Sequence, residues 1–132
     1  MLRPRLVRSC LKSFLDPSKP FGAHYGAVIG MQAVGGAEVV RVLMVPNLNE
    51  YSKLLSDGLE DAARRPAAER VLHAIIAVLA SLRDSQPALA NGHPAVVNEE
   101  LRAQLADKIG DLIAARIADA NEVQLAHLLL EA

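Results

Sequence analysis

The side chains best able to do chemistry are few, and they are scattered along the sequence. The four histidines are His24, His73, His93 and His127. No two of them stand four residues apart beside a carboxylate, which is the spacing that a zinc site on a helix requires. We therefore predict that the chain binds no metal and no cofactor. His24 is expected to serve helix packing or the surface, and His73 to lie at the edge of a helix.

The remaining reactive groups also favour structural roles. Cys10 is the only cysteine, so no internal disulfide or multi-cysteine zinc site can form, and a reducing compartment fits best. It lies among apolar residues, which favours a buried thiol over a nucleophile. Asp57, Glu60 and Asp61 could pair as in a glycosidase, but a charged run of this kind is typical of a solvated face. Gly35-Gly36 has neither the preceding strand nor the following Lys-Ser/Thr of a phosphate loop. We predict no catalytic residue and no enzyme activity.

Positive charge is concentrated at the beginning of the chain. Residues 1–19 contain five basic residues and one acidic residue, a net charge of +4, so residues 20–132 carry −5 within a total of −1. A nucleic-acid binder is usually basic throughout, so contact with DNA phosphate is confined to the first helix. Arg5, Arg8 and Lys12 form the candidate surface for an acidic partner or for phosphate. They lack interleaved aromatic residues that could read bases, so DNA is the weaker option.

Residues 1–15 also allow an alternative interpretation. They are rich in arginine and poor in acids, as in a mitochondrial transit peptide, so the alternative function is a mitochondrial helical protein with a targeting helix. An ordinary amphipathic helix explains the same residues. The longest apolar stretch, 21–46, is interrupted by His24, Gln32, Glu38 and Arg41, so we expect no membrane-spanning segment.

The elements that would position these residues are helices. The chain is 52% hydrophobic with 3% aromatic residues, no tryptophan and no threonine, and this composition disfavours a β-sandwich or barrel. Residues 3–15 have one apolar stripe at helical spacing. The stripe comprises Leu6, Val7, Cys10, Leu11 and Phe14. Pro17 and Pro20 end this helix, and the next helix spans 21–34, up to a glycine cap at Gly35-Gly36.

Further helices follow at similar spacing. A helix from about residue 37 must kink or restart at Pro46, and Asn47 with Glu50 is spaced as a capping box for the restart. A long helix is predicted from Pro66 to Asp84, followed by a loop over 85–97. Asn98 can cap a helix that continues to a break at 119–121, before a last segment. Six segments make about three antiparallel helix pairs of about 44 residues each, a length typical of HEAT repeats. The prediction is an all-α, HEAT-repeat-like α-solenoid.

Three glycines lie on one face of the helix at 21–34. Gly22, Gly26 and Gly30 are spaced by four residues, so they stand one above another. Each glycine costs a helix about 1 kcal/mol relative to alanine. Close approach of a neighbouring helix is the natural compensation, so Gly26→Leu is expected to unfold the domain or to destabilise it severely.

The same region carries a family resemblance. HYGAVIGMQAVG followed by VVRVLMVPNLNEY resembles the C-terminal HEAT domain of subunit six of the general transcription factor TFIID, a factor associated with TATA-binding protein. The segment His24–Val28 and Gly30 match the first family motif, and Leu43, Pro46 and Leu48 match the second. Met31 and Val34 replace leucines that are usual in the family. The specific match covers about residues 10 to 60.

The resemblance implies a single C-terminal HEAT-repeat domain over residues 1–132, without the N-terminal histone fold of the family. It implies a nuclear, non-catalytic scaffold that binds other subunits of TFIID and of the coactivator SAGA and supports transcription initiation by RNA polymerase II. Gly22, Tyr25, Gly26 and Gly30 are then the helix-packing motif. No membrane partner is expected. Which subunit occupies which groove, and whether the domain self-associates, are left open by the sequence.

Overall fold

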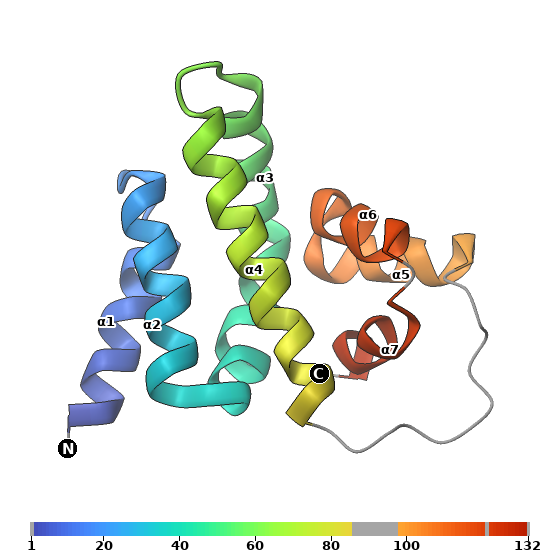
Figure 1. Cartoon of the computed structure of the whole chain (residues 1–132), viewed down its shortest axis with the longest axis horizontal. Helices are drawn as coiled ribbons and strands as arrows, with labels where there is room; N and C mark the ends of the chain where they lie inside the picture. Colours follow the sequence, from blue (N-terminus) through green and yellow to red (C-terminus); the bar gives the residue numbers. More distant parts are fainter. Residues whose placement is uncertain (1, 86–97, 121, 132) are drawn as a thin grey trace.

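The computed structural model describes residues 2–85, 98–120 and 122–131, and every regular element in these ranges is a helix (Figure 1). The all-α, HEAT-repeat-like prediction is confirmed. The elements are α1 (Leu2–Leu15), α2 (Phe21–Val39), the π-helical turn η1 (Val40–Met44), the 3-10 turn η2 (Val45–Asn47), α3 (Leu48–Glu60), α4 (Arg65–Ser85), α5 (Glu99–Ile109), α6 (Asp111–Asp119) and α7 (Val123–Glu131).

The first four α-helices form two antiparallel pairs that lie side by side (Figure 1). The α1–α2 pair packs on the α3–α4 pair mainly through α2 and α4, which run in the same direction. The third part differs from the expected helix pair. The single helix predicted from residue 98 is divided into α5 and α6 at Gly110, whose φ of 93° ends the helical path. Three short helices therefore take the place of the third pair.

The turns between the helices follow local chemistry. Asp16 Oδ1 accepts hydrogen bonds from the Ser18 amide at 2.9 Å and from the Ser18 hydroxyl at 2.6 Å, which closes the turn before α2. Gly36 has a φ of 64°, so the predicted break at Gly35-Gly36 is confirmed. Asn98 caps α5 by accepting the Leu101 amide at 2.8 Å, also as predicted.

The predicted Asn47–Glu50 capping box is wrong. Asn47 makes no side-chain cap to α3 and instead donates its amide Nδ2 to the carbonyl oxygen of Leu43 at 2.6 Å. Pro46 has no N–H, and the chain passes it as a 3-10 turn after a widened helical turn. Because helical geometry continues through this turn, the start of α3 does not need a side-chain cap.

One apolar helical stretch, Phe21–Glu60, is long enough to cross a membrane by length and composition, since an 18-residue window within it has a mean hydropathy of 1.6. It is not a single rod in the structure. It descends as α2, turns at Gly36 and again around Pro46, and returns as α3 (Figure 1). Its buried residues join the same core as α4 and α5, with α2 packed mainly on α1 and α4 and α3 packed mainly on α4 and α5.

The core runs continuously through every α-helix. Its largest fully buried side chains are Phe14, Met31, Met44, Leu48, Leu55, Leu72, Ile75, Leu79, Leu105, Ile109, Ile113 and Ile117. The stripe predicted for α1 is only partly correct. Phe14 is fully buried and Cys10 and Leu11 pack against the core, but Leu6 is 48% exposed. Leu6 lies on the outermost helix, α1, which packs mainly on α2 and therefore has one side without a neighbouring helix.

Candidate functional site

Four rings from the first three α-helices form a buried ring cluster. Phe14 of α1 stacks on Tyr51 of α3 with ring centroids 4.2 Å apart. His24 of α2 meets Tyr51 edge-on at 5.3 Å and Phe21 edge-on at 5.9 Å. The Nε2 of His24 lies 2.8 Å from the carbonyl oxygen of Asp16, and a carbonyl can only accept, so this nitrogen carries the proton. The cluster joins the α1–α2 turn to α3.

The buried ring cluster is structural rather than catalytic. His24 is fully buried and Tyr51 is 4% exposed, so a substrate cannot reach either ring. The Tyr51 hydroxyl and the His24 Nδ1 have no hydrogen-bond partner among the described residues. Burial in this apolar environment raises the pKa of Tyr51 well above its ordinary value. His24 therefore packs inside the domain, which is one of the two roles expected from the sequence.

Tyr51→Phe tests the raised pKa. Because the folded protein holds Tyr51 protonated at a pH where the unfolded chain has lost the proton, stability is fully present below the ordinary tyrosine pKa of 10.0 and falls as the pH rises above it. We expect Tyr51→Phe to be nearly neutral at pH 7, because the hydroxyl lacks a partner, and to reduce the loss of stability above pH 10. Urea unfolding across alkaline pH measures both effects. Tyr25→Phe, at a 43% exposed tyrosine, is the matched control. An identical alkaline slope in wild type and Tyr51→Phe would contradict the interpretation.

The glycine motif of α2 is placed differently from the sequence expectation. A Cβ added at Gly22 or Gly26 would meet no described atom within 4 Å, so the predicted close helix contact is wrong at these two positions. Tyr25 points outward as well and is 43% exposed. Gly30 alone of the motif glycines lies against another helix, where a Cβ would come within 2.8 Å of the Cys10 Sγ of α1. The absence of a side chain therefore allows close helix packing at Gly30, whereas at Gly22 and Gly26 it leaves open space.

Two glycines that sequence reasoning did not select make the closer contacts. At Gly58 a Cβ would collide with the ring of Phe21 and lie 3.1 Å from the Ala68 Cβ. At Gly110 a Cβ would collide with the Cβ of Ser52, and φ is already 93°. No spacing pattern marks either glycine, because both contacts come from helices distant in sequence.

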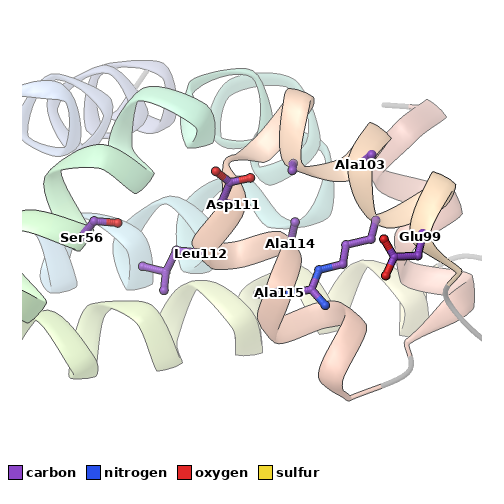
Figure 2. Close-up of a pocket in the computed structure, with 9 residues that line it drawn as sticks. Ser56, Glu99, Ala103, Asp111, Leu112, Ala114 and Ala115 are labelled. Atoms are coloured by element: carbon purple, nitrogen blue, oxygen red, sulfur yellow. The ribbon is translucent and has the colours of Figure 1, made fainter.

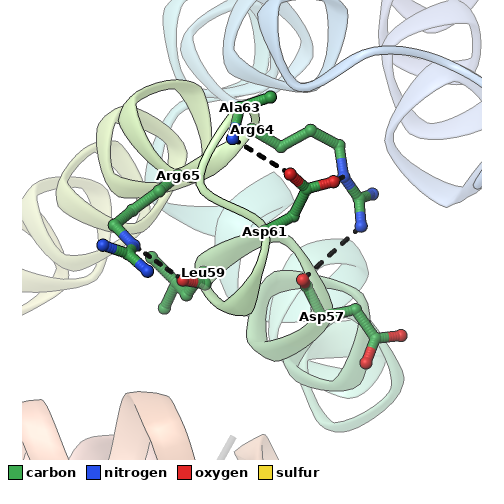
Figure 3. A network of polar contacts seen from close by, with 6 residues as sticks. All are labelled: Asp57, Leu59, Asp61, Ala63, Arg64 and Arg65. Carbon is green, nitrogen blue, oxygen red and sulfur yellow. Dashed lines mark hydrogen bonds and ion pairs between the residues drawn. The ribbon is translucent and has the colours of Figure 1, made fainter.

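The acidic run at the end of α3 closes the connection to α4 (Figure 3). Asp61 accepts the Ala63 amide at Oδ1 and the Arg64 Nε at Oδ2, each at 3.0 Å. The hydrogen bond from Arg64 is the main cause that lowers the pKa of Asp61. Arg65 Nε donates to the Leu59 carbonyl oxygen at 2.8 Å. Asp57 and Glu60 are exposed, and the run is a turn and a solvated face, as expected.

The other groups considered for chemistry stay apart. His73 is exposed on α4, Cys10 is half-buried on α1, and His93 lies outside the described residues. Within residues 2–85, 98–120 and 122–131, no group of three His, Cys, Asp or Glu side chains could hold a metal ion. The described part of the chain therefore offers grooves and charged faces as its candidate functional surfaces.

An open groove of about 530 Å³ lies along α5 and α6 and reaches Ser56 of α3. Four alanines and Leu112 supply its apolar surface. Its charged groups are Glu99, Arg102 and Asp111, which are of mixed sign. Figure 2 shows Asp111 and Glu99 on different helices with Ala114 between them in this view. Its lining contains no cysteine or histidine, and its one serine, Ser56, is on another helix.

A second groove, which we call the α2–α4 groove, lies between the N-terminal halves of these two helices. It consists of two adjoining hollows of about 400 and 310 Å³ that share Phe21, Gly22 and Ala67. The larger hollow extends over the α1–α2 turn, and the smaller one reaches Tyr25 and Arg70. The open side of Gly22 therefore faces a groove.

The basic face of α1 is exposed. Arg5, Arg8 and Lys12 are all exposed, and none of them forms an ion pair with a described residue. The partly exposed Leu6 lies on the same outer helix. The outward placement of these charges is observed, and their contact with a partner stays a prediction.

Comparison with known proteins finds similarity to transcription-factor subunits. Residues 1–49 match the family described as the TAF6 C-terminal HEAT repeat domain. The chain is 36% identical to the SAGA complex/transcription factor TFIID complex subunit Taf6 of Schizosaccharomyces pombe over 132 residues, which cover 98% of this chain and 28% of that protein. It is 45% identical to transcription initiation factor TFIID subunit 6b of Arabidopsis thaliana over 80 residues, 57% of this chain and 15% of that protein.

A human relative, aligned over a shorter part of the chain, is the TAF6-like RNA polymerase II p300/CBP-associated factor-associated factor 65 kDa subunit 6L, 40% identical over 60 residues, 46% of this chain and 10% of that protein. The chain thus spans 28% or less of the length of these relatives. No solved structure matches it significantly. The resemblance predicted from residues 10 to 60 is confirmed, and the alignment with the S. pombe protein extends it to 98% of the chain.

Proposed function

We propose that this chain, a homologue of the TAF6 C-terminal HEAT repeat domain, is a non-catalytic module that holds other subunits within TFIID and SAGA and supports transcription initiation by RNA polymerase II. The observation that carries the proposal is the alignment of 98% of the chain with a subunit named for both complexes. Residues 1–132 act in this proposal as one C-terminal HEAT-repeat domain working in the nucleus.

The described surface supports binding rather than catalysis. Asp61 is a turn residue, the acids of the α5–α6 groove are Glu99 and Asp111, and the ring cluster is closed to substrate. Stacked helix pairs of this kind offer extended surfaces to partner chains. The comparisons contain no support for the mitochondrial alternative.

The test is to purify the tagged full-length natural protein and to identify co-purifying chains by mass spectrometry, with nuclear and mitochondrial fractions analysed in parallel. We expect other TFIID or SAGA subunits to accompany the protein in the nuclear fraction. A protein recovered from mitochondria without any such subunit would contradict the proposal.

The basic face of α1 is proposed to contact an acidic partner chain or a preceding repeat, with DNA phosphate as the weaker candidate. Replacing Arg5, Arg8 and Lys12 together with glutamate should leave the melting temperature nearly unchanged, because exposed charges contribute about 0–1 kcal/mol each. The same change should weaken capture of the identified subunits in a salt-dependent way.

Arg41, Lys53 and Arg116 are exposed on other helices, and their joint replacement by glutamate changes the net charge by the same amount. This control variant should capture subunits as the wild type does. If the amount of captured subunits changes neither with the salt concentration nor with the α1 substitutions, the basic face is only a solvated surface.

A further inference from the structure

The α2–α4 groove has an apolar floor formed where two helices begin at the same end of the molecule (Figure 1). Phe21 and Ala67 supply apolar surface from α2 and α4, and Tyr25 borders the smaller hollow. Together the hollows are in the size range that accepts one or two large side chains.

Packing does not explain the glycine at the centre of this groove. A helical glycine costs about 1 kcal/mol relative to alanine, and a Cβ at Gly22 would meet no described atom within 4 Å. An alanine there would fit the folded domain without a collision. What glycine provides at this position is depth, because any larger side chain would project into the groove.

The charges around the groove are of one sign. Lys19, Arg64 and Arg70 line it, and no acidic residue does. Arg64 is partly neutralised by its ion pair with Asp61 at 3.0 Å, and Asp16 lies near Lys19, so Arg70 is the least compensated of the three.

Backbone groups at the same end add to this preference. Pro20 gives α2 no side-chain cap, and the first turns of α2 and α4 contain no acidic residue. The positive ends of two helix dipoles therefore meet at the groove, and the nearest carboxylates, those of Asp16 and Asp61, lie in the turns before the helices and do not line it.

We propose that the α2–α4 groove binds an acidic segment of another polypeptide, with a large apolar side chain of that segment anchored over Phe21, Gly22 and Ala67. The apolar floor selects a side chain, and the basic residues of the rim, Arg70 above all, select the acidic residues around it. A free phosphate would leave the apolar floor of the groove without a contact. A second copy of this chain would have to present its own acidic segment with an apolar side chain to the groove. This inference rests on the proposed function and specifies the chemistry of one partner contact.

The test uses the 132-residue chain as bait for a random-peptide display library. Enriched peptides are synthesised, and their affinities for the wild-type chain and for four variants, two single and two double, are measured by fluorescence anisotropy. Gly22→Leu fills the groove, and Lys19→Glu with Arg70→Glu reverses its charge, while Arg64 is kept because it closes the α3–α4 turn. Gly26→Leu, equally open but outside the groove, and Arg5→Glu with Arg8→Glu are the matched controls. Melting curves verify that each variant is folded.

We expect the enriched peptides to be acidic with an aromatic or leucine anchor. Each groove variant should weaken them about tenfold or more, equal to about 1.4 kcal/mol, and each control should change their affinity little. The inference is overturned if no acidic class is enriched, if the groove variants bind as well as the controls, or if inorganic phosphate alone displaces the peptides. A dimer of the wild-type chain that Gly22→Leu dissociates would also overturn it.

The two proposals fail in different ways. The groove proposal is refuted, and the scaffold function is left intact, by two results together. The full-length protein with the groove substitutions would still capture every TFIID or SAGA subunit, and the wild-type chain would bind no acidic peptide. Wild-type protein that captures none of these subunits refutes the function, whatever the peptides do.

Discussion

Gly110→Ala is expected to lower the free energy of unfolding by about 3 kcal/mol. The φ of 93° and ψ of 153° at Gly110 lie in a region that is almost restricted to glycine, so alanine is strained there by about 1–3 kcal/mol. The new Cβ would also collide with the Cβ of Ser52, an atom next to the backbone of α3 that cannot rotate away. The strain and the collision act together at the junction of α5, α6 and α3.

Urea unfolding followed by circular dichroism measures the loss. Gly26→Ala is the matched control, because Gly26 has a helical backbone and open space around it. It should be neutral or stabilise the domain by up to about 1 kcal/mol through helix propensity. Gly26→Leu should also stay folded, which reverses the expectation from the glycine spacing alone. Equal stability of Gly110→Ala and Gly26→Ala would show that the α5–α6 junction tolerates a side chain.

Phe14→Ala is expected to lower the free energy of unfolding by about 3–5 kcal/mol. Phe14 is fully buried and stacks on Tyr51 at 4.2 Å, so truncation removes a large apolar surface and leaves a cavity between α1 and α3. The loss also removes the aromatic contact itself, a smaller contribution of about 1 kcal/mol. This side chain is the anchor of the outermost helix.

The control for Phe14→Ala is the adjacent residue. Leu15 is 45% exposed on the same helix, so Leu15→Ala should cost about 1 kcal/mol or less. Thermal unfolding of both variants at neutral pH compares them directly. If the two variants melt together, then α1 contributes little to the cooperative core and its basic face is carried by a loosely attached helix.

Sequence and structure agree where the signal is local. Asn98 caps α5, Gly36 interrupts the helical path, and Pro46 forces a turn, and each of these effects is decided by a residue and its near neighbours. The long helix predicted from Pro66 to Asp84 is present as α4, whose buried residues include Val71, Leu72, Ile75, Leu79 and Leu82 at helical spacing. The family resemblance belongs to the same class, because it rests on residue types in order along residues 10 to 60.

The candidate site was harder to predict because it depends on which faces meet. Gly22, Gly26 and Gly30 are equivalent in the sequence, yet Gly30 alone lies against α1 and Gly22 opens into a groove. The groove itself is built from Phe21 and from Ala67, which are far apart along the chain and adjacent only because α2 packs on α4. Its positive rim is equally invisible in a chain whose net charge is −1.

By itself, the sequence determined the helical class, most of the breaks between helices, the positive first helix and the family resemblance. Periodicity, proline and glycine act over a few residues, so these features can be recognised without knowing the fold. The tertiary structure decided that Leu6 is exposed, that Gly110 divides a helix and lies against Ser52, and that His24 is buried in a cluster of rings to which three helices contribute. Those outcomes depend on the arrangement of helices distant in sequence. The residues of a helix face do not identify which other helix will pack on it.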